Sequence, residues 1–218
     1  MCLRGLVWIV ASLLAMRVAS ADTFSFTGMF LADDQIETFS LDVLVTSTVT
    51  IQTLSYAGGT NAASQVIPSG GFDPILSLFD SGGTLLNVTN DGSPNTDPST
   101  GAALDSLLSL SLDPGMYTLA LSQSDNQANG PTFADGFSEQ GAGSFTSTLG
   151  CSNGSFCDIT GANRDGKWAL DISGVESASD NNGSTVPEPK TILILLLGAA
   201  GMLCLRRRRK AEIHRATN

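Results

Sequence analysis

The C-terminal part of the chain holds a short apolar run enclosed by polar signals, and this arrangement limits how the remainder can fold. Residues 191–205 carry no charge, and five basic residues follow them directly. Such a cluster cannot enter hydrocarbon and stays on the cytoplasmic side of a membrane. The sequence therefore predicts a transmembrane helix at 191–205, with the preceding chain outside the cytoplasm and residues 211–218 as a cytoplasmic tail. The basic membrane stop consists of Arg206, Arg207, Arg208, Arg209 and Lys210.

A proline-bracketed acid stands directly before the apolar run, as Val186, Pro187, Glu188 and Pro189. This order of motif, short apolar helix and basic cluster resembles the PEP-CTERM sorting signal of Gram-negative bacteria, over residues 186–210. The resemblance implies recognition by a membrane-embedded exosortase, an inner-membrane intermediate, cleavage at or near the motif, and transfer to the cell envelope or the extracellular polymer. The alternative is an ordinary single-pass anchor or receptor, whose mature C-terminus would stay intact.

Residues 1–21 have the form of a secretory signal peptide. Arg4 precedes the apolar residues 5–16, and Ala19 and Ala21 occupy the positions of an Ala-x-Ala cleavage site. We therefore expect export and cleavage by signal peptidase. A retained N-terminal anchor is the alternative.

The stretch between the two signals is strongly acidic. Residues 22–189 contain 20 of the 21 Asp and Glu, but only Arg164 and Lys167 among the 11 basic residues, so their formal charge is about −18. Such a surface repels nucleic acid and anionic lipid, which excludes both as partners. Divalent cations and neutral polymers such as exopolysaccharide remain compatible with it.

Hydrophobic alternation with period two recurs between the signals, and it argues against a disordered chain. The segments 23–30, 39–45 and 167–172 each place apolar residues on one face, the last through Trp168, Leu170 and Ile172. We predict an all-β fold: an antiparallel, jelly-roll-like β-sandwich of about eight strands over residues 22–172. An N-terminal signal helix and the C-terminal transmembrane helix would flank it, with residues 173–185 as a flexible linker.

Two hairpins are predicted inside the sandwich. The first joins a central strand at 75–79 to residues 84–88 through a turn at 80–83. The second joins 108–112 to 117–121 through Asp113-Pro114-Gly115.

The segments 71–83, 90–92 and 168–172 together resemble the bacterial pre-peptidase C-terminal sandwiches, and most of all the DVUA-type ectodomains of PEP-CTERM proteins. The resemblance implies a non-catalytic β-sandwich over most of residues 22–175. It implies no particular ligand.

Cys151 and Cys157 enclose a short, flexible loop of five residues, Ser-Asn-Gly-Ser-Phe. In an oxidising exported compartment this spacing favours a disulfide over two free thiols.

The residues needed for common catalytic arrangements are missing from the exported part. The only histidine is His214, in the predicted cytoplasmic tail, so a Ser-His-Asp or Cys-His arrangement cannot form there. The segment 78–82 has the Asp-Ser-Gly form of an aspartic protease, but no second copy supplies the partner aspartate, and a turn explains it better. We predict that the protein is not an enzyme.

Several aspartates fall in loops around the first predicted hairpin, and Ca²⁺ binds six to eight such oxygens in flexible geometry. They form a candidate calcium site without EF-hand spacing; the alternative is turn residues on a solubilising acidic face. The candidates are Asp73, Asp80, Asp91, Asp97 and Asp105.

Together these features predict an exported, exosortase-processed protein with a structural or adhesive role in the envelope or extracellular matrix. The alternative is a secreted hydrolase or an accessory carbohydrate-binding domain. The spacing of Tyr56, Tyr117 and Trp168 favours core positions over an exposed sugar-binding platform.

Overall fold

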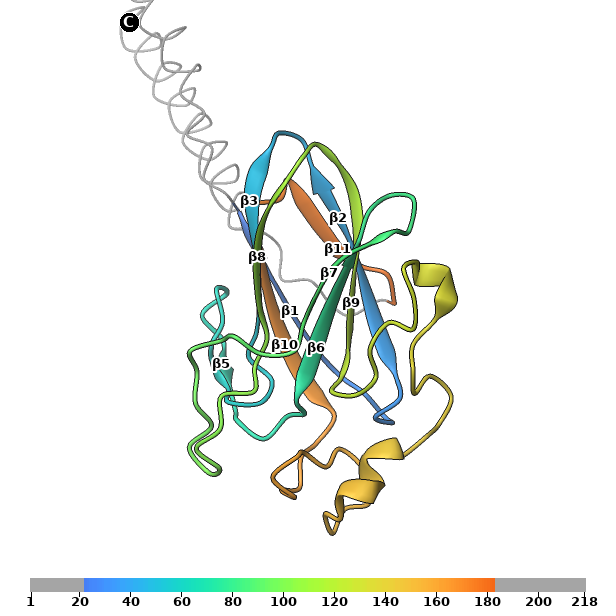
Figure 1. Ribbon diagram of the computed structural model, residues 1–218. Helices are drawn as coiled ribbons and strands as arrows, with labels where there is room; N and C mark the ends of the chain where they lie inside the picture. The colour runs from blue at the N-terminus through green and yellow to red at the C-terminus, as the bar shows by residue number, and fades with distance from the viewer. Residues whose placement is uncertain (1–21, 183–218) are drawn as a thin grey trace, which may run out of the picture.

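The computed structural model describes residues 22–182, which form two facing antiparallel sheets (Figure 1). One sheet has the order β1-β10-β3-β8 and the other β11-β2-β9-β6-β7, while β4 and β5 form a separate ribbon. The strands are β1 (Thr23–Met29), β2 (Ile36–Val43), β3 (Ser47–Thr53), β4 (Gly59–Thr60), β5 (Val66–Ile67), β6 (Pro74–Phe79), β7 (Leu85–Thr89), β8 (Leu107–Leu112), β9 (Gly115–Gln123), β10 (Lys167–Ser173) and β11 (Ser177–Asp180). Two short 3-10 helices are η1 (Phe133–Asp135) and η2 (Phe145–Leu149).

The main strands pair like one long hairpin wound onto itself. β6 pairs with β7, β3 with β8, β2 with β9, and β1 with β10, so each pair encloses the previous one along the chain. These four nested pairs, divided between two sheets, have the connectivity of an eight-stranded jelly roll. β11 and the β4–β5 ribbon are additions to it. The predicted antiparallel β-sandwich is confirmed.

The two predicted flanking helices, at 1–21 and 191–205, lie outside the described residues. Within residues 22–182, no helix has the length and apolar character needed to cross a membrane.

The first predicted hairpin is confirmed as β6–β7. The Asp80 side chain accepts hydrogen bonds from the backbone N–H groups of Gly82 and Thr84, at 2.9 and 2.8 Å, and Gly83 takes a positive φ of 80°. This side-chain cap and glycine close the turn. β6 is buried along its whole length because the segment after β9 crosses its outer face, where Phe79 packs with Phe137.

The second predicted hairpin is wrong. β8 pairs with β3 in one sheet, whereas β9 pairs with β2 and β6 in the other, so residues 113–114 cross between the sheets. The apolar alternation was real, since Leu108 and Leu119 both face the interior. Alternation shows only that a strand has one buried face. Both sheets bury one face against the same core, so alternation does not show which sheet a strand belongs to.

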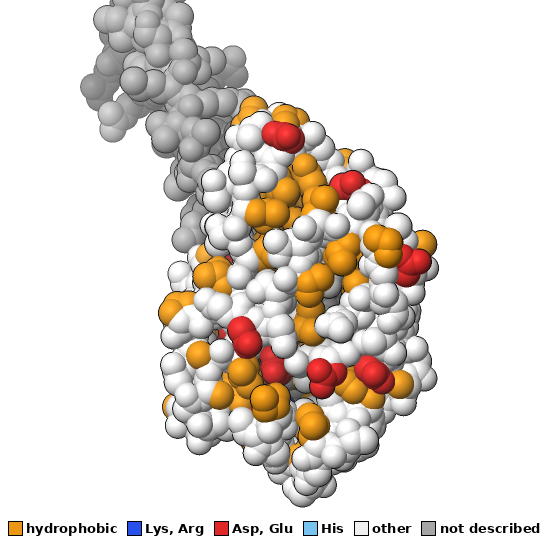
Figure 2. All heavy atoms as spheres, in the orientation of Figure 1, with side chains coloured by type: hydrophobic (Ala, Val, Ile, Leu, Met, Phe, Trp, Pro, Cys, Tyr) orange, Lys and Arg blue, Asp and Glu red, His pale blue; other side chains and the backbone are white. Residues whose placement is uncertain are grey.

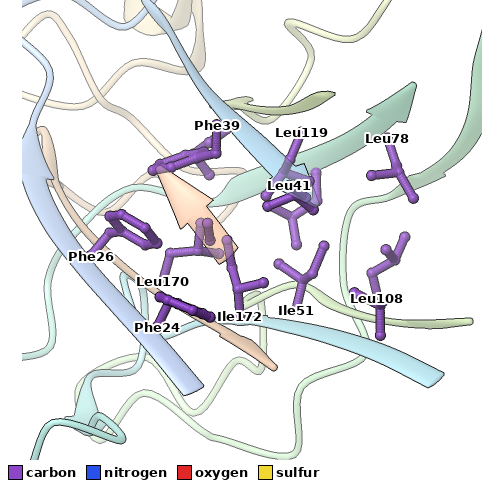
Figure 3. Packing of buried hydrophobic residues seen from close by; sticks show 14 of the residues in the cluster. Phe24, Phe26, Phe39, Leu41, Ile51, Leu78, Leu108, Leu119, Leu170 and Ile172 are labelled. Carbon is purple, nitrogen blue, oxygen red and sulfur yellow. The ribbon is translucent and has the colours of Figure 1, made fainter. Parts of the chain in front are cut away.

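The core lies between the two sheets (Figure 3). Phe26 and Leu170 of the four-stranded sheet face Phe39 and Leu41 of the other, and the Phe26 and Phe39 ring centroids are 5.0 Å apart. The predicted inward residues of the last long strand are all buried, namely Trp168, Leu170 and Ile172.

The structure corrects the predicted linker at 173–185. β10 includes Ser173, and β11 at 177–180 pairs antiparallel with β2, so the sandwich extends beyond residue 172. This strand lacked a hydrophobic signal because Ala178 is its only buried residue. Residues 183–185 lie outside the described residues.

Candidate functional site

The long loops of the sandwich gather at the lower end of Figure 1, and a buried arginine joins them. Arg164 is 4% exposed; its Nη2 lies 2.8 Å from Asp97 Oδ2 and its Nε 2.9 Å from Asp158 Oδ2. The guanidinium carbon sits 3.6 Å from the centroid of the Tyr56 ring, and the Tyr56 hydroxyl donates to Asp158 at 2.6 Å. One cation therefore ties three loops together.

The same cluster controls the protonation of its acids. Burial alone would raise the pKa of Asp97, but hydrogen bonds from Ser99, Arg164 and Thr100 outweigh burial and hold that pKa well below its usual range. The pKa of Asp158 is also lowered: burial opposes the shift, and bonds from Thr160, Tyr56 and Arg164 drive it. Both carboxylates are therefore charged at neutral pH, and both form ion pairs with Arg164.

Asp105 is buried by a different device. Its carboxylate accepts the backbone N–H groups of Ser55, Tyr56 and Ala57, at 2.7, 3.1 and 2.8 Å, and the hydroxyl of Thr53 at 2.9 Å. The side chain thus fixes the chain where it leaves β3, at Tyr56, whose ring contacts Arg164.

Asp73, directly before β6, is buried without a cation. Burial first, and then the charges of Asp91 and Asp158, together raise its pKa from 3.8 to about 8, against a hydrogen bond from Ser124. Asp73 Oδ1 has no hydrogen-bond partner among the described residues. At neutral pH this carboxyl group therefore holds its proton.

Of the five aspartates predicted to bind calcium, four have separate surroundings, and for Asp91 the structure gives only a pKa raised by burial. Asp80 caps a turn, Asp97 pairs with Arg164, and Asp105 holds backbone N–H groups. Asp73 is protonated, and within residues 22–182 no group of three or more His, Cys, Asp or Glu side chains could hold a metal ion. The geometry of the described residues thus gives no calcium cluster.

The predicted disulfide is confirmed between Cys151 and Cys157. The disulfide closes the loop immediately before Asp158. It therefore restricts the segment that carries Asp158, which is one of the two acids paired with Arg164.

The chain leaves the sandwich through a polar clasp formed by β11, the two residues after it, and the start of β2. The Asn181 backbone N–H donates to Thr38 O at 2.9 Å, and its side chain receives the Ser40 hydroxyl at 2.8 Å. Asn182 Nδ2 donates to Glu37 Oε1 at 2.6 Å. These contacts hold the chain as far as residue 182.

Glu37 is an acid on the inward face of β2, in line with Phe39 and Leu41. Burial first, and then a hydrogen bond and charge repulsion from Asp180, together raise its pKa from 4.5 to about 7, against hydrogen bonds from Asn182 and Thr38. The clasp therefore brings the carboxyl groups of Glu37 and Asp180 together.

A surface groove of about 450 Å³ lies between the β4–β5 ribbon and the adjoining ends of β1 and β10. Met29, Ile67 and Trp168 are among its lining residues. The Trp168 ring is 3% exposed and Tyr56 is fully buried, so these two aromatics are core residues, as predicted.

The arginine cluster and the clasp were not identified from sequence, although both had signals. Arg164 and Lys167 are the only basic residues in 22–189 and stand among 20 acids, so the sequence favours an acidic partner for each of them. Glu37 shares the parity of Phe39, Leu41 and Val43, which places an acid on an inward face. The predicted processing residues, at 19, 21, 186–189 and 206–210, lie outside the described residues.

Comparison with known proteins adds one assignment. Residues 185–210 match the PEP-CTERM protein-sorting motif, which confirms the signal predicted at 186–210. No curated protein matches the chain. Among solved structures it is similar to the pre-peptidase C-terminal domain of collagenase from Bacillus anthracis, with 10% identity, 71% of this chain and 87% of that chain covered, and a TM-score of 0.33.

Proposed function

We propose that this chain is an exported β-sandwich protein that an exosortase processes and that then serves a structural or adhesive role in the cell envelope or extracellular matrix. The match of residues 185–210 to the PEP-CTERM sorting motif carries the proposal. A sorting motif of this kind indicates export through the membrane with an exosortase as the processing partner. The sandwich is then the cargo that remains.

The use of the buried charges supports a structural role for that cargo. Arg164 pairs with both Asp97 and Asp158 within the loops, and Asp105 accepts three backbone N–H groups and the Thr53 hydroxyl. These groups stabilise the loop end of the sandwich, and a disulfide closes one loop. An exported protein gains from such cross-links because it must persist outside the cell.

The surface supports contact with neutral polymers. All charged side chains visible on the face shown in Figure 2 are acidic, with apolar side chains between them. An acidic surface repels nucleic acid and anionic membranes but not neutral polysaccharide. The groove lined by Met29, Ile67 and Trp168 makes an accessory carbohydrate-binding domain the second candidate.

The C-terminus of the mature protein tests the main proposal. The full chain is expressed in a Gram-negative host with and without its exosortase, and the intact mass of the envelope and secreted fractions is measured. We expect loss of the residues after the Pro187–Pro189 region only when the exosortase is present. A Glu188→Ala variant is the matched control and should be processed more slowly. A mature protein that retains Arg206–Lys210, or one found in the cytosol, would contradict the proposal.

The role of the cargo needs a separate experiment. The processed protein is incubated with isolated envelope polysaccharide in a pull-down and, in parallel, with a panel of hydrolase substrates. Retention without turnover supports the structural or adhesive role. Turnover of any substrate would favour the hydrolase alternative instead.

A further inference from the structure

The groove between the β4–β5 ribbon and the ends of β1 and β10 is held open by the fold itself. The turn of the ribbon is fixed to the sheet, because the backbone N–H of Ala62 donates to Asp171 Oδ2 at 2.8 Å and that of Ala63 donates to Ser25 Oγ at 3.1 Å. Next to this anchor the ribbon, labelled at β5 in Figure 1, and the sheet enclose about 450 Å³. Small-molecule sites in proteins typically measure about 300–1,000 Å³ and have a mostly apolar lining.

Apolar side chains line this groove, and two of them are exposed. Met29 is 60% exposed and Val66 is 79% exposed, while Ile67 and Pro68 continue the lining. A contiguous exposed apolar patch with polar residues around it marks an interaction site, whereas a single exposed apolar residue does not. The groove therefore suits a ligand with an apolar part.

The groove also contains a hydrogen-bond donor that the fold does not use. Trp168 is a lining residue, and its Nε1 is buried with no hydrogen-bond partner among the described residues. A buried indole N–H normally has a partner. A Cβ at Gly28, another lining residue, would lie 2.6 Å from Trp168 Cε2, the ring carbon bonded to Nε1, so this nitrogen lies beside the wall of the groove. A ligand with an acceptor oxygen would satisfy the donor.

The charge around the groove favours a neutral ligand. Lys167 is a lining residue, and its Nζ lies 2.6 Å from Asp165 Oδ2 in an exposed ion pair, so the two charges cancel locally. The exported chain as a whole is strongly acidic, which opposes the approach of anions. A ligand for this groove thus needs an apolar group and an acceptor oxygen, but no charge.

We propose that the groove binds acetyl groups carried by a neutral polysaccharide, with the methyl group against Met29 and Val66 and the carbonyl oxygen accepting a hydrogen bond from Trp168 Nε1. This inference rests on the proposed adhesive role and names the polymer chemistry that the role would use. The Trp168 ring does not stack on sugar rings, because it packs in the core with Phe30 and Phe39, at centroid distances of 6.3 and 5.8 Å. Recognition therefore depends on the acetyl substituent.

Binding requires one small rearrangement. Trp168 Nε1 is covered in the free protein, so a side chain at the wall of the groove must change rotamer before an oxygen can reach it. Met29 is exposed, unbranched and adjacent to Gly28, which makes it the side chain for this step. Rotamer changes of this kind are common at binding sites whose backbone moves little.

Trp168 itself reports on binding, because it is the only tryptophan in residues 22–189. The processed protein is titrated with tri-N-acetylchitotriose, with O-acetylated cellotriose and with unmodified cellotriose, and the indole emission is followed. We expect a saturable change in emission with the acetylated trisaccharides, and at least about tenfold weaker binding of cellotriose, which lacks the group that the site recognises. The acetylated probe that binds more tightly shows whether the natural acetyl groups are attached through nitrogen or through oxygen.

Substitutions locate the ligand. Val66→Asp places a charge in the groove at an exposed position and should weaken binding of the acetylated probes at least about tenfold, without lowering the melting temperature. Val45→Asp is the matched control, because Val45 is 70% exposed and is not a lining residue, and this variant should bind as wild type does. Trp168→Phe removes the N–H donor and should weaken binding by a similar factor in isothermal titration calorimetry. If this core variant does not fold, the comparison of Val66→Asp with Val45→Asp decides.

The outcomes distinguish the two proposals. If the chain is not processed, or if the processed protein is not retained on envelope polysaccharide, the proposed function fails. If the processed protein is retained but the acetylated trisaccharides bind no better than cellotriose, the groove proposal is overturned while the adhesive role stands. Equal binding of the acetylated probes by Val66→Asp and Val45→Asp would overturn it as well.

Discussion

Buried carboxyl groups are handled in opposite ways at two places in this sandwich. In the loops, Asp97 and Asp158 share one buried arginine, and their pKa values are lowered. At the rim where the chain leaves, Glu37 and Asp180 face each other, and the pKa of Glu37 is raised to about 7. The first arrangement gains from charge at neutral pH, whereas the second gains from a proton.

The difference shows which part of the molecule is built to stay closed. The arginine cluster joins three loops and loses its stabilisation only as acid protonates its carboxylates. The clasp joins one edge strand to its neighbour and weakens near neutral pH, where the cluster is intact. Four substitutions sharpen or break this contrast.

Arg164→Met should have the largest effect. It leaves Asp97 and Asp158 buried without a cation, and breaking a buried ion pair from one side costs about 3–5 kcal/mol. Urea unfolding of the exported protein at pH 7 measures the change. Lys167→Met is the matched control: its pair with Asp165 is exposed, so the change should stay below about 1 kcal/mol. Equal stabilities of the two variants would remove the loop cluster from the comparison.

Asp105→Ala should come next. The substitution strands the backbone N–H groups of Ser55, Tyr56 and Ala57, and an unsatisfied buried donor costs about 1–3 kcal/mol. We expect a loss of at least about 2 kcal/mol in the same urea experiment. Asp105→Asn keeps one acceptor oxygen and should fall between wild type and the alanine variant. An alanine variant as stable as wild type would show that these donors find water instead.

The fold was largely predictable because its strands alternate cleanly. The first hairpin was predictable from a strand at 75–79 that is apolar on both faces and from the turn residues Asp80 and Gly83. The partner of β8 was not predictable. The alternation of apolar and polar residues in β8 is the same whether the strand pairs with β9 or with β3. Strand β11 was missed because Ser177–Asp180 has one small buried side chain and is held by backbone and polar contacts.

The site was predictable only at the level of the sorting motif, whose residues are contiguous. The Arg164 cluster draws Tyr56, Asp97 and Asp158 from three separate loops, and no spacing along the chain links them. The aspartates near β6 looked like one group because they are close in sequence. In the fold they point to different partners, since adjacent loop residues take different directions once each loop is fixed.

Asp73→Asn tests an acid that has no cation, within the loop end itself. The raised pKa of Asp73, about 8 against 3.8, means that the folded state binds a proton that the unfolded state releases, so wild-type stability falls as the pH rises from about 4 to about 8. The amide cannot ionise, so the variant should be more stable than wild type at pH 8, by about 1–2 kcal/mol after allowance for relaxation. At pH 4 the two proteins should be nearly equal. A variant less stable than wild type at pH 8 would mean that the ionised acid is stabilised there.

Glu37→Gln should have the smallest and most local effect. It tests whether the stabilisation at the rim is lost as the pH rises, in contrast to the stabilisation at the arginine cluster, which is lost as the pH falls. The pKa of Glu37, raised from 4.5 to about 7, predicts that wild type loses stabilisation of β11 as the pH rises through 7. Glutamine keeps an acceptor for Asn182 and a donor for Asp180 at every pH. Hydrogen exchange of the Ala178–Asn181 amides, corrected for intrinsic pH dependence, should therefore accelerate above pH 7 in wild type and not in the variant, with a difference of about 1 kcal/mol or less. The amides of β9 opposite Glu37 serve as the internal control. If the β9 amides accelerate together with those of β11, the whole sheet is opening. The rim then does not open independently of the sandwich, and the contrast with the arginine cluster fails.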